Sequence, residues 1–182
     1  MSSIVILGSG IYGVTAALEL RRRGHTINLL DPGPIPHPLA TSTDISKAVR
    51  MDYGSDDFYM ALMEVALERW RGWNHHFGET LYHEDGMLFL AGNPMAPGGF
   101  EYESYHRLQA RGHPVERLPP DVSSSRFPAL AAHRYPDGYF NPHAGWADSS
   151  RVVIRLLEEA QTRGVHLRAG QAFARLLTSS SR

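Results

Sequence analysis

The sequence contains no cysteine among its 182 residues. Disulfide bonds and thiolate metal sites are therefore excluded, and cysteine usage gives no information about the redox compartment. Long hydrophobic runs are also missing, because the apolar stretches reach only the length of a strand, so we expect no membrane-spanning segment. An excess of one charge is lacking as well. The formal net charge is −1 and the basic residues are scattered, which argues against a nucleic-acid surface.

The remaining composition is typical of a soluble globular protein. Hydrophobic residues make up 42% of the chain and charged residues 20%, so disorder is not indicated. The length suits one domain of about 100–200 residues, or one domain and part of another. An apolar strand is predicted directly after the first residues, which leaves no room for a signal peptide. We therefore expect a cytoplasmic protein without a membrane partner, and a peroxisomal location stays open for a longer parent protein.

The first 31 residues carry the most informative pattern of the chain. An apolar run over 4–7 leads into a Gly-x-Gly-x-x-Gly turn, which opens a helix predicted over 12–23. We expect Gly8 to allow the tight turn, Gly10 to let the backbone approach a pyrophosphate, and Gly13 to let the helix lie close to the sheet. Together with the strand that follows, the turn predicts an α/β fold of the Rossmann type that binds an adenine dinucleotide.

The predicted ligand contacts come from backbone N–H groups and one carboxylate. The N–H groups of Ile11 and Tyr12 lie at the start of the predicted helix, where the positive end of the helix dipole also favours phosphate. Asp31 follows the strand predicted over 26–30, where a carboxylate can accept hydrogen bonds from ribose hydroxyls and would repel a 2′-phosphate. The motif alone therefore leaves FAD and NAD open and argues against NADP.

A second candidate site follows over residues 40–54. Ser42 or Thr43 is predicted to cap a short helix whose unpaired N–H groups would form a second anion site for the same pyrophosphate. Lys47 and Arg50 are three residues apart and would share one face of that helix. Two cations there could hold the negative charge of a reduced flavin or of a substrate carboxylate. The alternative interpretation is an exposed basic face without a ligand.

The middle of the chain predicts further elements without a chemical motif. A long helix is expected from residue 55 to 77, with an apolar stripe that packs in the core. The stripe consists of Phe58, Leu62, Ala66, Trp70, Trp73 and Phe77. Two strands over 81–83 and 87–91 flank an Asp-Gly turn and predict a β-hairpin. A helix over 101–111, an extended segment over 114–118 and a loop or short helix up to residue 127 follow. His75 and His76 cannot both face one metal from adjacent helical positions, so no metal site is expected.

The last third of the sequence predicts a return to the nucleotide-binding fold. Residues 139–142 indicate a strand that enters a turn, and Asp148 is expected to cap a helix. The expected buried face of that helix comprises Val152, Val153, Leu156, Leu157 and Ala160. Strands are predicted over 165–167, which would rejoin the parallel sheet, and over 172–174. Trp146 suits a cavity wall and the protein core equally well.

Three segments together resemble a known family. They are the glycine turn, the pattern Ser-Thr-Asp-x-x-Lys-x-x-Arg-x-x-Tyr-Gly over 42–54, and Gly-Tyr-Phe-Asn-Pro-x-x-Gly-Trp-Ala-Asp over 138–148. They are similar to FAD-dependent amine oxidases of the D-amino-acid oxidase superfamily, in the group of sarcosine, pipecolate, saccharopine and fructosyl-amino-acid oxidases. The resemblance implies FAD rather than NAD. It also implies a Rossmann-like FAD-binding βαβ fold over 1–78 and 139–182, with the start of an inserted α+β substrate domain over 79–138.

The resemblance further implies an activity and roles for four residues. Family members oxidise the C–N bond of a secondary amine or amino acid with O2, giving an imine and hydrogen peroxide. Ser42 and Thr43 would contact the cofactor, Lys47 would lie near the isoalloxazine ring, and Arg50 would border the active site. Lys47 stands where sarcosine oxidases carry arginine and fructosyl-amino-acid oxidases carry lysine, which argues against sarcosine as the substrate.

The resemblance covers only the N-terminal half of a family member, so we expect a truncated chain. An active oxidase, a catalytically silent FAD-binding fragment and an NAD-dependent dehydrogenase remain alternative interpretations. The expected small-molecule partners are an amine or amino acid and O2. The sequence does not indicate an oligomeric state.

Overall fold

The computed structural model describes residues 1–131 and 134–175, which form two compact units. The first unit comprises Met1–Lys47 and the described residues from Asp148 onward, and the second comprises Ala48–Ala147. These boundaries do not coincide with those expected at residues 78 and 139. The assignment of one part to the cofactor and another to the substrate therefore stays a prediction.

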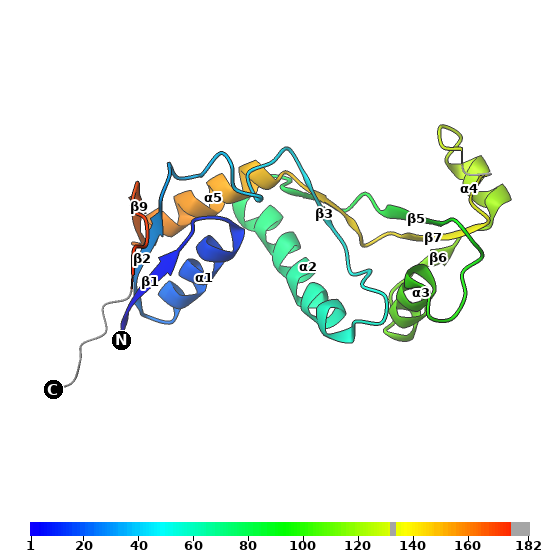
Figure 1. Ribbon diagram of the computed structural model, residues 1–182, viewed down its shortest axis with the longest axis horizontal. Coiled ribbons are helices and arrows are strands. Elements are labelled where there is room, and N and C mark those ends of the chain that lie inside the picture. Colours follow the sequence, from blue (N-terminus) through cyan, green and yellow to red (C-terminus); the bar gives the residue numbers. More distant parts are fainter. Residues whose placement is uncertain (132–133, 176–182) are drawn as a thin grey trace. The chain divides into compact units, whose positions relative to one another are not determined.

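The first unit is built on a parallel sheet, with its helices on one side (Figure 1). Its strands are β1 (Ser3–Leu7), β2 (Thr26–Asp31) and β9 (His166–Ala169), in the order β1-β2-β9. Helix α1 (Ile11–Arg22) connects β1 to β2, and α5 (Ser149–Thr162) precedes β9. In the parallel register, Ile6 pairs with Leu29, which in turn pairs with Leu167. The predicted α/β fold and the return of the chain to the parallel sheet after residue 165 are confirmed.

The core of the first unit lies where α1 packs against β2 and α5. Ile27 and Leu29 point from β2 into this core and are fully buried, because alternate residues of a strand share one face of the sheet. From α1, Val14 and Ala17 complete the layer. The predicted buried face of α5 is confirmed for all five residues, and the Asp148 side chain accepts a hydrogen bond from the Arg151 N–H at the start of the helix.

Among its described residues, the second unit contains two three-stranded sheets and three helices, and one strand begins at Lys47, the last residue of the first stretch of the first unit. One sheet has the order β3-β8-β4, and its strands are β3 (Lys47–Val49), β8 (Gly145–Ala147) and β4 (Tyr82–His83). The other has the order β5-β7-β6, and its strands are β5 (Met87–Ala91), β7 (Asp137–Asn141) and β6 (Glu116–Arg117). The helices are α2 (Asp57–Phe77), α3 (Phe100–Ala110) and α4 (Pro120–Arg126). The helices predicted over 55–77 and 101–111 are thus confirmed.

The predicted hairpin over residues 81–91 is wrong. Strand β4 pairs with β8 and β5 pairs with β7, so the two strands belong to different sheets. Residues 84–86 form no turn, and the N–H of Gly86, which has a left-handed φ of 83°, donates to the carbonyl oxygen of Ala144 rather than closing a hairpin. Gly145 allows β8 to approach β4 closely, because a Cβ there would lie 1.9 Å from the carbonyl oxygen of His83. A partner distant in sequence therefore overrides the local turn signal.

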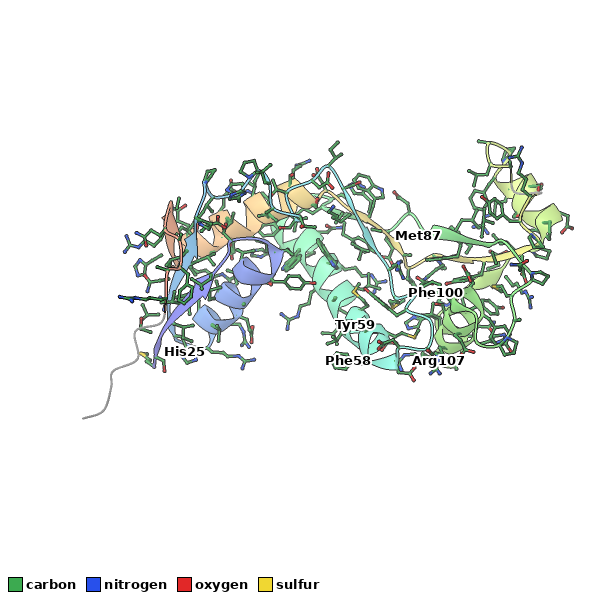
Figure 2. All side chains as sticks on the ribbon, in the orientation of Figure 1. His25, Phe58, Tyr59, Met87, Phe100 and Arg107 are labelled. Carbon is green, nitrogen blue, oxygen red and sulfur yellow. The ribbon has the colours of Figure 1, made fainter. Side chains whose placement is uncertain are left out.

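The apolar stripe predicted for the core does not form the buried face of α2. Phe58 and Leu62 are 68% and 48% exposed, whereas Met60 and Leu67 are buried. Figure 2 shows Phe58 beside Tyr59 near the N-terminal end of this helix. Apolar residues occur on several faces of α2. Their spacing therefore predicted a helix, but it did not indicate which face of the helix is buried.

Asn74 attaches the buried side of α2 to β4. Its side-chain oxygen accepts from the N–H groups of Leu81 and Tyr82, and its side-chain nitrogen donates to the Tyr82 carbonyl oxygen at 2.6 Å. The helix ends four residues later at Gly78, which has a left-handed φ of 64°.

Residues 172–174 are not a strand, in contrast to the prediction. The N–H of Gln171 still bonds to the Asp31 carbonyl oxygen at 2.9 Å, but the described chain beyond it makes no ladder. Over residues 1–131 and 134–175, none of the helices combines the length and the apolar content that crossing a bilayer requires.

Candidate cofactor site

The glycine turn has the conformation and the close contacts that were expected of it. Gly8 has a left-handed φ of 95°, and its N–H donates to the Leu30 carbonyl oxygen at 2.8 Å. A Cβ at Gly13 would lie 1.8 Å from the Gly8 carbonyl oxygen and 3.4 Å from Cδ1 of Leu29. Only glycine therefore allows α1 to start this close to the strand ends.

Gly10 has a different neighbour. A Cβ at this position would meet only Oγ of Ser42, at 2.9 Å. The same Ser42 hydroxyl oxygen accepts a hydrogen bond from the N–H of Ile11 at 3.2 Å. The start of α1 is thus bordered by residue 42, although 31 residues separate Ser42 from Ile11. Tyr12 follows with an exposed side chain, so its expected contact with a ligand involves the backbone.

Asp31 binds the glycine turn directly. Its Oδ2 accepts from the backbone N–H of Ser9 at 2.9 Å and from the Ser9 hydroxyl at 2.7 Å, and its Oδ1 accepts from the N–H of Gly33 at 3.1 Å. Both Ser9 and Asp31 are buried. Ser9 was not among the site residues predicted from the sequence. The sequence did contain a signal for this contact, because Ser9 is a hydroxyl residue inside the glycine turn and Asp31 is an acid at the end of the next strand.

The hydrogen bonds also determine the charge of Asp31. Burial alone would raise the pKa of the Asp31 carboxyl, but the bonds from Ser9 and Gly33 outweigh burial and hold the pKa below its usual value. The group is therefore a carboxylate at neutral pH. Because each carboxylate oxygen has two lone-pair sites, Asp31 retains capacity to accept from ribose hydroxyls.

The short helix predicted after Ser42 is not formed. Residues 40–45 are turns and bends, and Lys47–Val49 is the strand β3. The segment is held instead by the Asp44 carbonyl oxygen, which accepts from the hydroxyls of Ser149 and Ser150 at 2.8 and 2.9 Å. The start of α5 therefore positions Ser42 and Thr43. The Thr43 hydroxyl oxygen is buried, and it has no hydrogen-bond partner in the described part of the chain.

Lys47 and Arg50 do not share a helical face. Lys47 is in β3, and its Nζ lies 2.6 Å from Oδ2 of Asp44 in the first unit. That pair lowers the pKa of Asp44, mainly through the hydrogen bond from Lys47. Arg50 follows β3 in the second unit, and residues three apart in an extended chain point to opposite faces. The expectation of two cations on one helix face is wrong.

Arg50 lies over two aromatic rings. Its guanidinium carbon is 5.1 Å from the ring centre of Tyr53 and 5.6 Å from that of Phe100. Its Nη1 is buried and lacks a hydrogen-bond partner among the residues that the structure describes. Guanidinium groups favour stacking on aromatic faces, which leaves their N–H groups free to bind an anion at the edge.

Asp52, two residues further, is a fully buried carboxyl that the sequence analysis missed. It accepts from the hydroxyl of Tyr139 at 2.6 Å and from the side-chain nitrogen of Asn141 at 2.9 Å. Burial raises the pKa of Asp52, against the lowering effect of these two bonds and of the nearby Arg50 charge. The signal available in the sequence was an acidic residue between Met51 and Tyr53.

The residues that the structure describes contain no cluster of three or more His, Asp or Glu side chains arranged to hold a metal ion.

Comparisons with known proteins match residues 3–180 to the family described as FAD dependent oxidoreductase (DAO). The chain is 28% identical to L-saccharopine oxidase of Schizosaccharomyces pombe over 180 residues, which covers 93% of this chain and 41% of that protein. It is 26% identical to N-methyl-L-tryptophan oxidase of Salmonella arizonae over 163 residues, which covers 86% of this chain and 42% of that protein. The chain thus spans less than half the length of these curated relatives.

Solved structures share the fold. L-proline dehydrogenase from P. horikoshii is similar with a TM-score of 0.85 at 23% identity, over 98% of this chain and 46% of that one. L-amino acid deaminase from Proteus vulgaris is similar with a TM-score of 0.81 at 20% identity, over 98% of this chain and 42% of that one. Because the family match extends over almost all of its residues, the chain belongs to the FAD dependent oxidoreductase (DAO) family.

Proposed function

We propose that this chain binds FAD, with the turn of residues 8–13 at the pyrophosphate and Asp31 at the adenosine ribose. The observation that carries the proposal is the close packing of Gly13 on the Gly8 carbonyl, at the start of α1, in a chain of an FAD-dependent family. Helix N-termini bind phosphate through their unpaired N–H groups and the helix dipole.

Two hydroxyl groups support further contacts with the cofactor. The Ser42 hydroxyl oxygen accepts from Ile11, so its own hydrogen is available to donate to a phosphate oxygen. The Thr43 hydroxyl oxygen is buried without a partner in the described residues, although buried polar atoms usually have one. A polar cofactor atom at this position would provide the missing hydrogen bond.

We further propose that the protein oxidises the C–N bond of a secondary amine or amino acid, with O2 as the acceptor and an imine and hydrogen peroxide as products. FAD supplies the hydride acceptor when it is bound. Lys47 would place positive charge near the isoalloxazine ring, and the unpartnered N–H groups of Arg50 would bind an anionic group of the substrate. Support for the substrate class comes from relatives named for L-saccharopine and N-methyl-L-tryptophan.

A titration of the purified chain with FAD tests the first proposal. We expect the native chain to bind FAD and the Gly10→Ala variant to bind it at least about tenfold more weakly, because a methyl group would obstruct the pyrophosphate. Gly72→Ala is the matched control, since a Cβ at this position of α2 meets no atom within 4 Å. Equal FAD affinity of both variants, or no binding by the native chain, would refute the proposed site.

The same purified chain distinguishes the two remaining interpretations, which are an NAD-dependent dehydrogenase and a catalytically silent FAD-binding fragment. Binding of NAD without FAD would indicate a dehydrogenase. Binding of FAD without peroxide formation from a panel of secondary amines and amino acids would indicate a catalytically silent FAD-binding fragment.

A further inference from the structure

Arg50 and Asp52 bring opposite charges into the second unit with one residue between them. Because a residue spans at most about 3.6 Å of chain, their Cα atoms lie within about 7 Å of each other. The positive charge of Arg50 lowers the pKa of Asp52, yet Nη1 of Arg50 is buried without a hydrogen-bond partner among residues 1–131 and 134–175. The two groups therefore interact through their charges, and this guanidinium N–H group stays available to another acceptor.

Uncharged groups from two other elements hold the carboxyl of Asp52. Tyr139 and Asn141 of β7 donate to its two oxygens at 2.6 and 2.9 Å. From α3, the ring of Tyr105 lies with its centre 5.7 Å from that of Tyr139. Burial raises the pKa of Tyr139, so its hydroxyl keeps its proton at neutral pH. The positive charge that compensates an ionised Asp52 is therefore that of Arg50.

Aromatic rings hold the guanidinium of Arg50 without neutralising it. The guanidinium lies over the rings of Tyr53 and Phe100, and Tyr59 of α2 stacks on Tyr53 with 5.5 Å between the ring centres. A ring face attracts a cation, but it carries no net charge. The countercharge of Arg50 therefore comes from Asp52 as long as no other anion is bound.

An anion bound at Nη1 of Arg50 would place a second negative charge beside one guanidinium. Like charges disfavour each other's ionised form, and the interior of a protein screens this effect only weakly. Arg50 keeps its proton in either case, whereas a carboxyl can lose its charge by taking up a proton. Because Asp52 is fully buried, its ionised form depends on a nearby cation. Replacement of one negative charge by another at Arg50 is thus lower in free energy than the coexistence of both.

We propose that Asp52 is a positioning residue that balances the charge of Arg50 in the free protein and takes up one proton from solvent when a monocarboxylate binds at Arg50. The inference rests on the proposed role of Arg50 at an anionic group of the substrate. No covalent bond of the ligand changes in this step. The carboxylate of the ligand replaces that of Asp52 as the countercharge, and the net charge of the site stays the same. Binding of carboxylates should therefore weaken as the pH rises through the titration of Asp52.

Carboxyl ¹³C NMR of the purified chain tests the coupling, with trifluoroacetate as the probe because it stays ionised over the whole titration. We expect saturation with trifluoroacetate to raise the titration midpoint of Asp52 by at least about one pH unit, which corresponds to a coupling of about tenfold. Trifluoroacetamide, an uncharged analogue of similar shape, should leave the midpoint unchanged. Absence of trifluoroacetate binding, an unmoved midpoint, or an equal shift with trifluoroacetamide would overturn the proposal.

Arg50→Gln and Arg69→Gln form a matched pair of substitutions. Both replace an arginine by an uncharged amide, but Arg69 lies on the exposed surface of α2. We expect Arg50→Gln to raise the midpoint of Asp52 in the absence of an anion and to abolish its response to trifluoroacetate, whereas Arg69→Gln should respond like the native chain. Equal responses of the two variants would contradict the proposal. If Arg50→Gln does not fold, the comparison of the two probes on the native chain decides.

The experiment is independent of the proposed oxidation, because trifluoroacetate contains no C–N bond. A raised midpoint in a chain that forms no peroxide from amines would support the coupling and contradict the oxidation. Peroxide formation together with an unmoved midpoint would contradict the coupling alone.

Discussion

At the scale of single residues, Asp52 is completely buried and accepts side-chain hydrogen bonds from Tyr139 and Asn141. Its pKa is raised above the usual value, mainly by burial. A carboxyl with a raised pKa in the folded state favours folding when it is protonated and opposes folding once the pH has risen through that pKa. The hydrogen bonds from Tyr139 and Asn141 therefore contribute most to stability at neutral pH, because the ionised carboxylate of Asp52 requires hydrogen-bond donors.

Tyr139→Phe removes one of these donors and tests the argument. We expect a loss of about 1–3 kcal/mol in the free energy of unfolding at pH 7, and a smaller loss near pH 4, where the protonated carboxyl is favoured. Urea unfolding at both pH values measures the difference, with Tyr135→Phe at an exposed tyrosine as the control. An equal loss at both pH values would show that the hydrogen bond does not depend on the charge of Asp52.

At the scale of secondary structure, the glycine turn and α1 make a matched pair of substitutions possible. Gly13→Ala would bring a Cβ within 1.8 Å of a backbone oxygen, whereas Gly10→Ala would meet only the end of the Ser42 side chain at 2.9 Å. We expect Gly13→Ala to cost about 2 kcal/mol or more and Gly10→Ala less than about 1 kcal/mol, as measured by urea unfolding. Similar costs for the two would mean that α1 shifts away from β1 with little resistance.

Ion pairs connect α2 to the C-terminal end of α3. Glu64 accepts from Arg111 at 2.8 and 2.6 Å and lies 2.8 Å from Nε2 of His113, and Asp57, the first residue of α2, pairs with Arg107. Figure 2 shows Arg107 on α3 beside the N-terminal end of α2. The hydrogen bond from Arg111 is the main cause that lowers the pKa of Glu64 from 4.5 to about 2.

Because the pKa of Glu64 is lowered on folding, its contribution is present above pH 4.5 and is lost as the pH falls towards 2. We expect Glu64→Gln to cost about 1 kcal/mol at pH 7 and to reduce the loss of stability between these two pH values. Thermal unfolding across that range measures the effect. Glu68→Gln, on the exposed side of the same helix, should leave the pH profile unchanged.

Helices with a local signal at one or both ends were predictable from the sequence. Helices α2, α3 and α5 are followed by Gly78, Gly112 and Gly164, each with a positive φ, and α2 and α5 begin after an aspartate cap. Elements that depend on distant partners were not predictable. The segment after Ser42 forms turns and a strand because the start of α5 and strand β8 hold it, and neither contact leaves a pattern within residues 40–54.

The candidate site follows the same division. Gly8 and Gly13 have the expected conformation and close contacts, and Asp31 ends β2 as predicted, because these features depend on short stretches of sequence. The hydrogen bond between Ile11 and Ser42 and the separation of Lys47 from Arg50 depend on the path of the intervening chain. Residue spacing alone does not determine that path.

At the scale of the whole molecule, the first unit is built from two stretches of chain between which the entire second unit is inserted. The pairing of Asn28 with His166 and of Asp31 with Ala169 joins the two stretches in one sheet. Such non-local contacts slow folding, because the entropy of closing a long loop is lost before the contacts form.

The pairing of β2 with β9 has a consequence for synthesis on the ribosome. Strands β1 and β2 and helix α1 emerge early, but the second neighbour of β2 is translated only after all of Ala48–Ala147. At ordinary translation rates the delay is on the order of ten seconds. During that interval the nascent sheet presents two unpaired edges, so molecular chaperones that bind extended apolar segments would have their longest opportunity to act on this part of the chain.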